Sequence, residues 1–223
     1  MSTPPRVVLF DLDGTLVDSA PDIAHAADSA LLACGFPPRG ADAIRAYIGN
    51  GAERLIHRCL TGEMDGLAEA EDFARTYAAW QRCYQDGLTT RTVIYPGVLE
   101  TLHALHEAGV RLGVVTNKPA RFTVPLLEAL DLARFFAVTL SGDSLPVKKP
   151  DPLPLRTAIE QLGGEPARAA MVGDSLADLR AAKAAGVRAL CVSYGYSPNV
   201  DLREHAPDAF VDRMDALLPL LLP

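Results

Sequence analysis

The chain has 223 residues, of which 49% are hydrophobic and 22% charged, a composition typical of a globular protein with a substantial core. Its formal net charge of -7 disfavours non-specific binding to nucleic acid or to an anionic membrane. The N-terminus lacks an apolar signal core, no apolar run approaches the ~20 residues of a membrane span, and the cysteines form no CxxC pair. These features predict a soluble cytoplasmic protein with reduced thiols.

The chain opens with an apolar run at 7–10, which predicts a short buried strand, and a helical block follows it. Between about residues 18 and 90, apolar residues recur at helical spacing, and Pro or Gly marks several ends. Helices are expected at 21–33, 42–48, 53–60 and 67–85, with no convincing strand among them. The last helix carries an aromatic stripe, interpreted as core rather than as a ligand surface. It consists of Phe73, Tyr77, Trp80 and Tyr84.

From Pro96 onward, helical and strand patterns alternate. The expected strands are 111–115, 136–140, 169–172, 189–192 and 209–211, and the expected helices are 98–108, 122–130, 153–162, 176–185 and 214–222. Pro125 lies inside one of these helical patterns and obscures where that helix begins. The alternation predicts an α/β fold with a Rossmann-like, doubly wound parallel sheet. The core domain would comprise 1–17 and 93–223, with a helical domain inserted at 18–92.

Polar residues directly follow three of the expected strands, and ligands of an open parallel sheet bind beyond the carboxyl ends of its strands. The residues are Asp11 and Asp13 after the first strand, Thr116, Asn117 and Lys118 after the second, and Gly173, Asp174 and Ser175 after a third, with Asp178 four residues beyond Asp174. A Pro-rich connection contributes Lys149. Each residue alone also fits a helix cap, a turn or a solvated loop charge. Together they predict one coherent site at this edge of the sheet.

The gathered carboxylates predict a cation among them, since two such charges ~4 Å apart repel by about 4 kcal/mol even at an effective dielectric near 20. The ligands would be hard oxygens, without His or Cys at suitable spacing, which favours Mg²⁺ over Zn²⁺. An ionised Asp11 can act as a nucleophile, and Asp13 can serve as general acid and then base. With Mg²⁺ and Lys149, these groups suit phosphoryl transfer.

Four segments resemble, in order, the four motifs of the haloacid dehalogenase superfamily. They are Asp11-Leu12-Asp13-Gly14-Thr15-Leu16, Val115-Thr116-Asn117, Lys149-Pro150 and Gly173-Asp174-Ser175-Leu176-Ala177-Asp178. The Asp-x-Asp pair resembles the phosphatase branch, and the helical insertion resembles the small α-helical cap of that superfamily. Segments 47–55, 114–119 and 148–152 are similar to bacterial phosphoglycolate phosphatases. The resemblance implies Mg²⁺-dependent hydrolysis of a small phosphorylated metabolite, with 2-phosphoglycolate the expected substrate.

The resemblance also implies a role for each matched residue. Asp11 would form an aspartyl phosphate, and Asp13 would protonate the leaving alcohol and then activate water. The phosphate would be held by Gly14, Thr116, Asn117 and Lys149, together with backbone N–H groups near Leu12, Asp13 and Asn117. The metal would be held by Asp11, Asp13 through its carbonyl oxygen, Asp174 and Asp178, the last either beyond the direct ligands or bound through water.

The substrate's leaving group is expected to meet the cap. Asn50, Gly51 and Arg54 would bring backbone donors and a cation to the glycolate carboxylate, with Arg45 a competing candidate. Alternatively, 49–51 is only a helix-ending turn and Arg54 a surface charge.

Two other functions stay open. One is another capped phosphatase or a sugar-phosphate mutase of the same superfamily, and the other is a phosphoryl-accepting regulatory domain. No nucleic-acid or membrane partner is expected, and the chain would be a monomer or homodimer.

Overall fold

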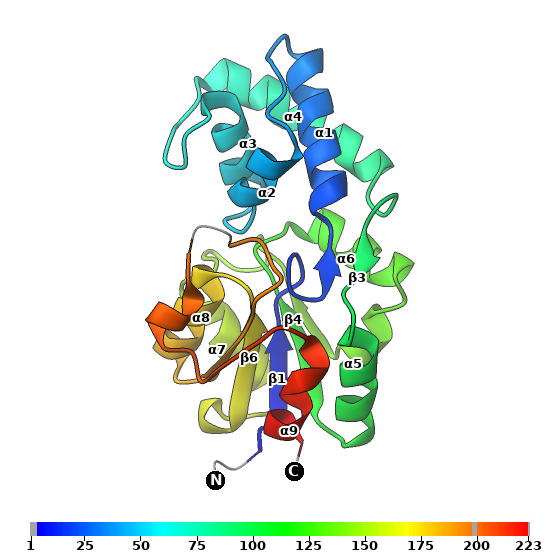
Figure 1. Cartoon of the computed structure of the whole chain (residues 1–223), viewed down its shortest axis with the longest axis vertical. Coiled ribbons are helices and arrows are strands. Elements are labelled where there is room, and N and C mark those ends of the chain that lie inside the picture. The colour runs from blue at the N-terminus through cyan, green and yellow to red at the C-terminus, as the bar shows by residue number, and fades with distance from the viewer. Residues whose placement is uncertain (1–3, 198–199, 223) are drawn as a thin grey trace. The chain divides into compact units, whose positions relative to one another are not determined.

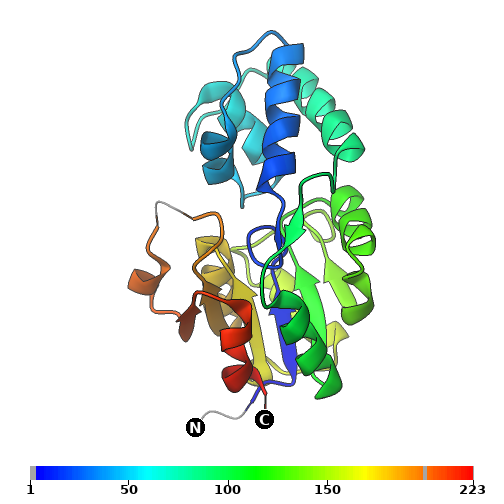
Figure 2. The same ribbon diagram turned by 45° about the vertical axis from the view of Figure 1, so that its right-hand side comes forward.

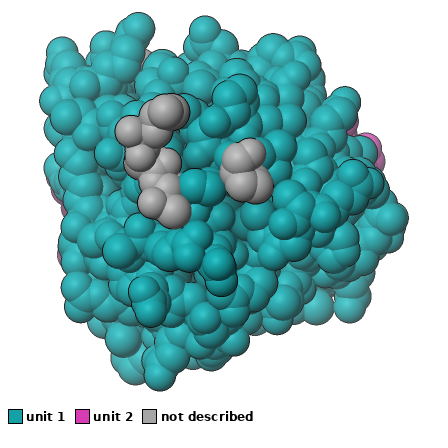
Figure 3. All heavy atoms as spheres, turned by 90° about the horizontal axis from the view of Figure 1, so that it is seen from below, with its two compact units in different colours: residues 1–18, 94–223 teal, residues 19–93 magenta. Residues whose placement is uncertain are grey.

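The computed structural model describes residues 4–197 and 200–222. Contacts divide the chain into two units, of which unit 1 comprises residues 1–18 and 94–223 and unit 2 comprises residues 19–93 (Figure 3). The short strands β2 (Val17–Asp18) and β3 (Val93–Ile94) pair in a two-stranded sheet where the chain leaves and re-enters unit 1. Among the described residues, every helix is too short or too polar to cross a bilayer.

Unit 1 is built on a parallel sheet, which confirms the predicted α/β fold. Its strands are β1 (Val7–Phe10), β4 (Arg111–Val115), β5 (Val138–Leu140), β6 (Ala169–Gly173), β7 (Arg188–Val192) and β8 (Ala209–Val211). Their order is β5-β4-β1-β6-β7-β8, and every neighbouring pair is parallel. Phe10 is in register with Val114 and Val172. The residues that follow these three strands therefore reach the same edge of the sheet.

Helices cover both faces of this sheet (Figures 1 and 2). The regular helices are α5 (Val98–Glu107), α6 (Ala120–Ala129), α7 (Leu153–Gln161), α8 (Leu176–Ala185) and α9 (Leu218–Leu221), with 3-10 turns η1 (Ala133–Phe135), η2 (Pro166–Arg168), η3 (Leu202–His205) and η4 (Met214–Leu217). Val7 and Leu9 share one apolar core with α7 and α8. Val8 and Phe10 are equally buried and point to the opposite face, because side chains alternate along a strand. Helices α5 and α9 contact each other, and α5 packs on β4.

The elements of unit 1 differ from the predictions mainly at their ends. Helix α6 begins at Ala120, two residues before the expected start, and continues through Pro125. A proline at this position removes one backbone hydrogen bond and crowds the preceding turn, yet the helix continues to Ala129. The expected helix at 214–222 is split into η4 and the four-residue α9. Pro219 stands in the first turn of α9, where a missing N–H has no intrahelical partner to lose.

Unit 2 consists of α1 (Ala20–Ala33), α2 (Ala41–Tyr47), α3 (Ala52–Thr61) and α4 (Ala70–Asp86). The aromatic stripe of α4 forms a continuous stack: the ring centroids of Phe73 and Tyr77 lie 5.4 Å apart, those of Tyr77 and Trp80 6.0 Å, and those of Trp80 and Tyr84 5.2 Å. Trp80 and Tyr84 are buried, as the interpretation of the stripe as core requires, whereas Phe73 and Tyr77 are half-buried.

Candidate active site

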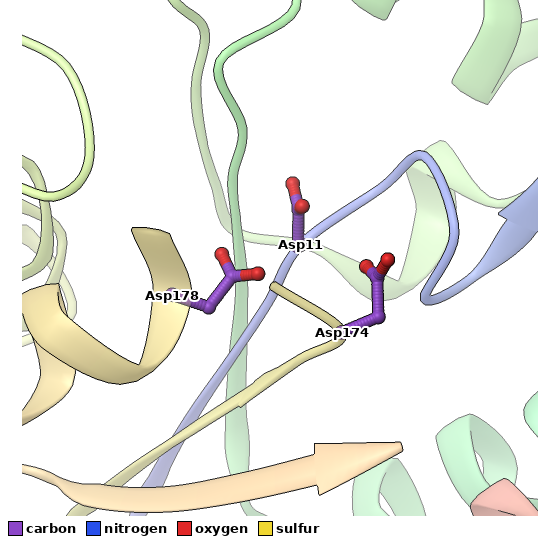
Figure 4. Close-up of side chains that lie close together, drawn as sticks. All are labelled: Asp11, Asp174 and Asp178. Carbon is purple, nitrogen blue, oxygen red and sulfur yellow. The ribbon is translucent and has the colours of Figure 1, made fainter. Parts of the chain in front are cut away.

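Three buried carboxyl groups meet at the carboxyl edge of the sheet. Asp11 follows β1, Asp174 follows β6, and Asp178 lies in the first turn of α8. Figure 4 shows the three side chains projecting from these separate segments with their carboxyl groups close together. One oxygen of each lies within 4.8 Å of an oxygen of the others. The sequence prediction placed these three carboxylates together, and the structure does so.

Asp174 is held in place by neighbours from two other segments. Its Oδ1 accepts a hydrogen bond from Thr15 Oγ1 at 2.7 Å, and its Oδ2 accepts one from the backbone N–H of Tyr196 at 2.8 Å. Both segments approach so closely that glycine is required beside the carboxylate. A Cβ atom at Gly14, where φ is +86°, or at Gly195 would collide with the Asp174 side chain.

Asp178 is fixed by the end of its own helix. Ser175 and Asp178 form a reciprocal capping box, in which Asp178 Oδ2 accepts from the Ser175 hydroxyl at 2.6 Å and from its backbone N–H at 3.0 Å. The other oxygen, Oδ1, accepts from Lys149 Nζ at 2.6 Å. Both oxygens of Asp178 therefore have donors, which suits a residue that orients Lys149.

Lys149 bridges two of the carboxylates. Its Nζ lies 2.9 Å from Asp11 Oδ1 and 2.6 Å from Asp178 Oδ1, and the side chain is buried. The backbone of Lys149 is fixed by Asn117, whose side-chain amide donates to the Lys149 carbonyl at 3.0 Å and accepts from its N–H at 3.0 Å. The Asn117 side chain thus positions the lysine. The predicted contact of Asn117 with phosphate would therefore come from the backbone N–H of Asn117.

The site carries excess negative charge in a buried place. Burial raises the pKa of Asp11 to about 6, against the opposing attraction of Lys149. Burial, reinforced by Asp178 and Asp11, raises the pKa of Asp174 to about 8. Burial disfavours the charge of Lys149, but Asp11 and Asp178 outweigh it and raise the pKa of this ammonium. A cation bound among these carboxylates would favour their charged forms and so lower these pKa values.

The donor set fits a hard metal ion. The ligand atoms are carboxylate oxygens, which Mg²⁺ and Ca²⁺ prefer. Asp11 Oδ1 is buried and lies 2.9 Å from Lys149 Nζ. An ionised carboxylate has about four lone-pair positions, so this contact leaves Asp11 able to coordinate a metal ion. The cluster of Asp11, Asp174 and Asp178 is therefore the candidate metal site of the chain.

Asp13 is directed elsewhere. Its carboxylate lies 3.0 and 3.1 Å from Lys118 Nζ, and it is not a member of the acidic cluster. Sequence reasoning placed Lys118 at the sheet edge but assigned it no role. Thr116, also buried, accepts a hydrogen bond from the Lys118 backbone N–H at 3.2 Å. The segment after β4 thus brings a hydroxyl and an ammonium to the site.

The expected cap residues lie in unit 2. Gly51 precedes α3 with φ of +91°, and Asn50 is exposed. The Arg54 guanidinium donates to the carbonyls of Gly66 at 3.1 Å and Met64 at 2.7 Å. It also pairs with Asp65 at 3.2 Å. Arg54 is thus bound to the loop after α3, and its expected contact with substrate stays a prediction.

Comparison with known proteins agrees with this geometry. The family model of haloacid dehalogenase-like hydrolases matches residues 5–186. A phosphoglycolate phosphatase of Nitrosococcus oceani is 42% identical over 97% of this chain and 96% of its own. Phosphoglycolate phosphatase 1 of Pseudomonas aeruginosa is 46% identical over 96% of this chain and 79% of its own.

Solved structures give the same result. The crystal structure of a predicted phosphoglycolate phosphatase from Haemophilus somnus superposes with a TM-score of 0.90 at 33% identity, covering 97% of this chain and 98% of that one. The family model covers most of the chain, and the four motif segments of the sequence lie at one sheet edge. The chain belongs to the haloacid dehalogenase-like hydrolases.

Proposed function

We propose that the protein is a Mg²⁺-dependent phosphatase that hydrolyses 2-phosphoglycolate to glycolate and phosphate through an aspartyl phosphate. The observation that carries this proposal is the Asp11 carboxylate, which lies 2.9 Å from Lys149 beside the buried cluster. The Asp11 carboxylate, the proposed nucleophile, thus has a neutralising cation beside it and is itself part of the candidate metal site. The relatives named as phosphoglycolate phosphatases support the choice of substrate.

In the first half-reaction, an Asp11 oxygen attacks phosphorus while the bond from phosphorus to the leaving oxygen breaks. The Asp13 carboxyl group gives its proton to that oxygen. Glycolate then departs with a neutral hydroxyl group where the phosphate ester was. Lys149 offsets charge on Asp11 and on the transferring phosphoryl group. Thr116 and backbone N–H groups of the loops after β1 and β4 hold the phosphoryl oxygens.

In the second half-reaction, water attacks phosphorus and gives a proton to Asp13. The bond between phosphorus and Asp11 breaks, which releases phosphate and restores both aspartates. A bound Mg²⁺ would supply charge neutralisation and orientation of the phosphoryl group. Asp11, Asp174 and the Asp13 carbonyl would hold it, with Asp178 orienting Lys149 and reaching the metal through water.

A substrate screen tests the proposal. Phosphate release is measured from a panel of small phosphomonoesters with Mg²⁺ and with EDTA, and without any added bisphosphate. We expect Mg²⁺-dependent turnover with 2-phosphoglycolate among the best substrates and near-complete loss in Asp11→Asn. Dependence on a sugar bisphosphate would identify a mutase, and one phosphorylation per chain without turnover would identify a regulatory domain. Full activity of Asp11→Asn would exclude the proposed nucleophile.

A further inference from the structure

We infer that Lys118 binds the carboxylate of the substrate's leaving group, and that it is the residue of unit 1 that selects acid-bearing phosphomonoesters. The inference rests on the proposed function and deepens it. The observation behind it is that the Lys118 ammonium lies 3.0 and 3.1 Å from the two oxygens of Asp13. Only 4% of the Lys118 side chain is exposed.

The position of Asp13 fixes where the leaving oxygen of the substrate lies. A general acid must come within about 2.6–3.2 Å of the oxygen that it protonates. The leaving oxygen of the substrate therefore sits beside the Asp13 carboxyl group. Lys118 Nζ lies one hydrogen-bond length from that group, close enough for the ammonium to meet a charged group carried next to the leaving oxygen.

The substrate carries its carboxylate close to its leaving oxygen. In 2-phosphoglycolate, the carboxylate carbon is joined to the leaving oxygen through a single methylene, which puts the two roughly 2.4 Å apart. A carboxylate so close to the leaving oxygen falls within reach of a cation that touches the general acid. A longer leaving group with a distant charge would not meet Lys118 in this way.

The charge beside the Lys118 ammonium changes when Asp13 carries a proton. An Asp13 ready to give a proton is neutral, and the Lys118 ammonium then loses the negative charge that Asp13 supplies in this structure. The substrate carboxylate restores an anion beside the buried ammonium. Lys118 keeps all its protons throughout, and the contact is an ion pair without any covalent change.

The backbone around Lys118 supports a fixed position for this cation. Its N–H donates to the Thr116 hydroxyl at 3.2 Å, and its carbonyl accepts from the Gly142 N–H at 2.8 Å and from the Thr123 hydroxyl at 3.1 Å. A Cβ atom at Gly142 would collide with the backbone of Asn117. The close contact with the chain after β5 therefore holds the Lys118 segment in place.

The test compares two substrates of nearly equal size. Phosphate release is measured from 2-phosphoglycolate and from 2-hydroxyethyl phosphate, which has a hydroxymethyl group in place of the carboxylate. Lys118→Met should lower kcat/KM for 2-phosphoglycolate at least tenfold more than for 2-hydroxyethyl phosphate. Lys183→Met, a substitution of an exposed lysine on α8, is the matched control and should leave both values unchanged. An equal loss on both substrates would show that Lys118 acts only on Asp13, and would overturn the inference.

A binding measurement separates recognition from proton transfer. In the Asp11→Asn background with Mg²⁺, calorimetry should show tighter binding of 2-phosphoglycolate than of 2-hydroxyethyl phosphate. Adding Lys118→Met should remove that difference, and a difference that persists would contradict the inference. If the wild-type enzyme hydrolyses 2-hydroxyethyl phosphate but not 2-phosphoglycolate, the proposed function fails and this inference fails with it. A wild-type preference for 2-phosphoglycolate that Lys118→Met leaves intact overturns the inference alone.

Discussion

Asp178 Oδ1 lies 2.6 Å from Lys149 Nζ, and the other oxygen of Asp178 closes the first turn of its own helix. A rigid helix end thus aims the ammonium that also touches Asp11. The carboxylate has a structural and an electrostatic function at once. Because Lys149 is buried, its charge needs both aspartates to balance the loss of hydration.

Asp178→Asn should therefore reduce turnover more than it reduces metal binding. The amide keeps the size of the side chain but removes the charge that orients Lys149, so we expect kcat to fall at least tenfold. The helix cap weakens as well, which should lower the free energy of unfolding by about 1 kcal/mol. Steady-state phosphate release and thermal unfolding measure the two effects. Asp131→Asn, at an exposed residue with φ of +56° that Asn tolerates, is the control and should change neither. A wild-type kcat in Asp178→Asn would contradict this account of Lys149.

The raised pKa of Asp174 predicts how metal-free protein responds to pH. Its folded pKa of about 8 lies above the ordinary 3.8, so the folded state holds a proton that the unfolded chain releases. This contribution to stability is present below the ordinary pKa and is lost as pH rises through the folded value. In EDTA, Asp174→Asn should therefore be more stable than wild type near pH 8, and the difference should shrink toward pH 5.

Added Mg²⁺ should reverse that order. Binding stabilises the folded wild-type protein by about 2.7 kcal/mol when the ion is at 100 times its Kd. Asp174→Asn lacks a charged ligand and should gain little. Thermal unfolding of both proteins, with Mg²⁺ and with EDTA at each pH, gives the comparison. A metal-induced shift of equal size in the two proteins would remove Asp174 from the metal site.

Gly195→Ala should disturb the metal site without removing a charged group. The added methyl group would collide with Asp174, which must move or lose its bond from Tyr196. We expect the apparent Mg²⁺ affinity to fall at least tenfold, measured from the dependence of phosphate release on Mg²⁺. Gly87→Ala is the matched control, because its new Cβ would find its nearest neighbour at an ordinary 3.6 Å. Unchanged Mg²⁺ dependence in Gly195→Ala would show that this close approach has no bearing on the metal.

The carboxyl edge of the sheet was predictable from the sequence for two reasons. Short apolar runs such as 7–10 and 169–172 indicate buried strands, and parallel strands align the residues that follow them. Asp11 and Asp174 are found by that rule, whereas Lys149 lies in a Pro-rich connection and does not directly follow a strand. The paired strands β2 and β3, with two residues each, escape it because so short a segment has no period to detect.

The partners of the site residues depend on contacts distant in sequence. Lys118 meets Asp13 across 105 positions, and the Tyr196 N–H meets Asp174 from the loop after β7. The position of Lys118 after a strand was visible, but its pairing was not, since a lysine in a loop is ordinarily solvated. Gly195 offered a weak signal, because it too follows a strand at the active edge.

Arg54→Met distinguishes the two interpretations of the expected cap residues. The guanidinium donates to the carbonyls of Gly66 and Met64, which would be left without this donor, so we expect the melting temperature to fall by several degrees. Arg75→Met, which removes an exposed ion pair with Asp72 in the same unit, is the control and should change it little. The ratio of kcat/KM for 2-phosphoglycolate to that for 2-hydroxyethyl phosphate is measured on the same proteins. A tenfold fall in the ratio would support the predicted contact with the substrate carboxylate. A ratio equal to that of wild type, together with the loss of stability, would assign Arg54 to the loop that it binds.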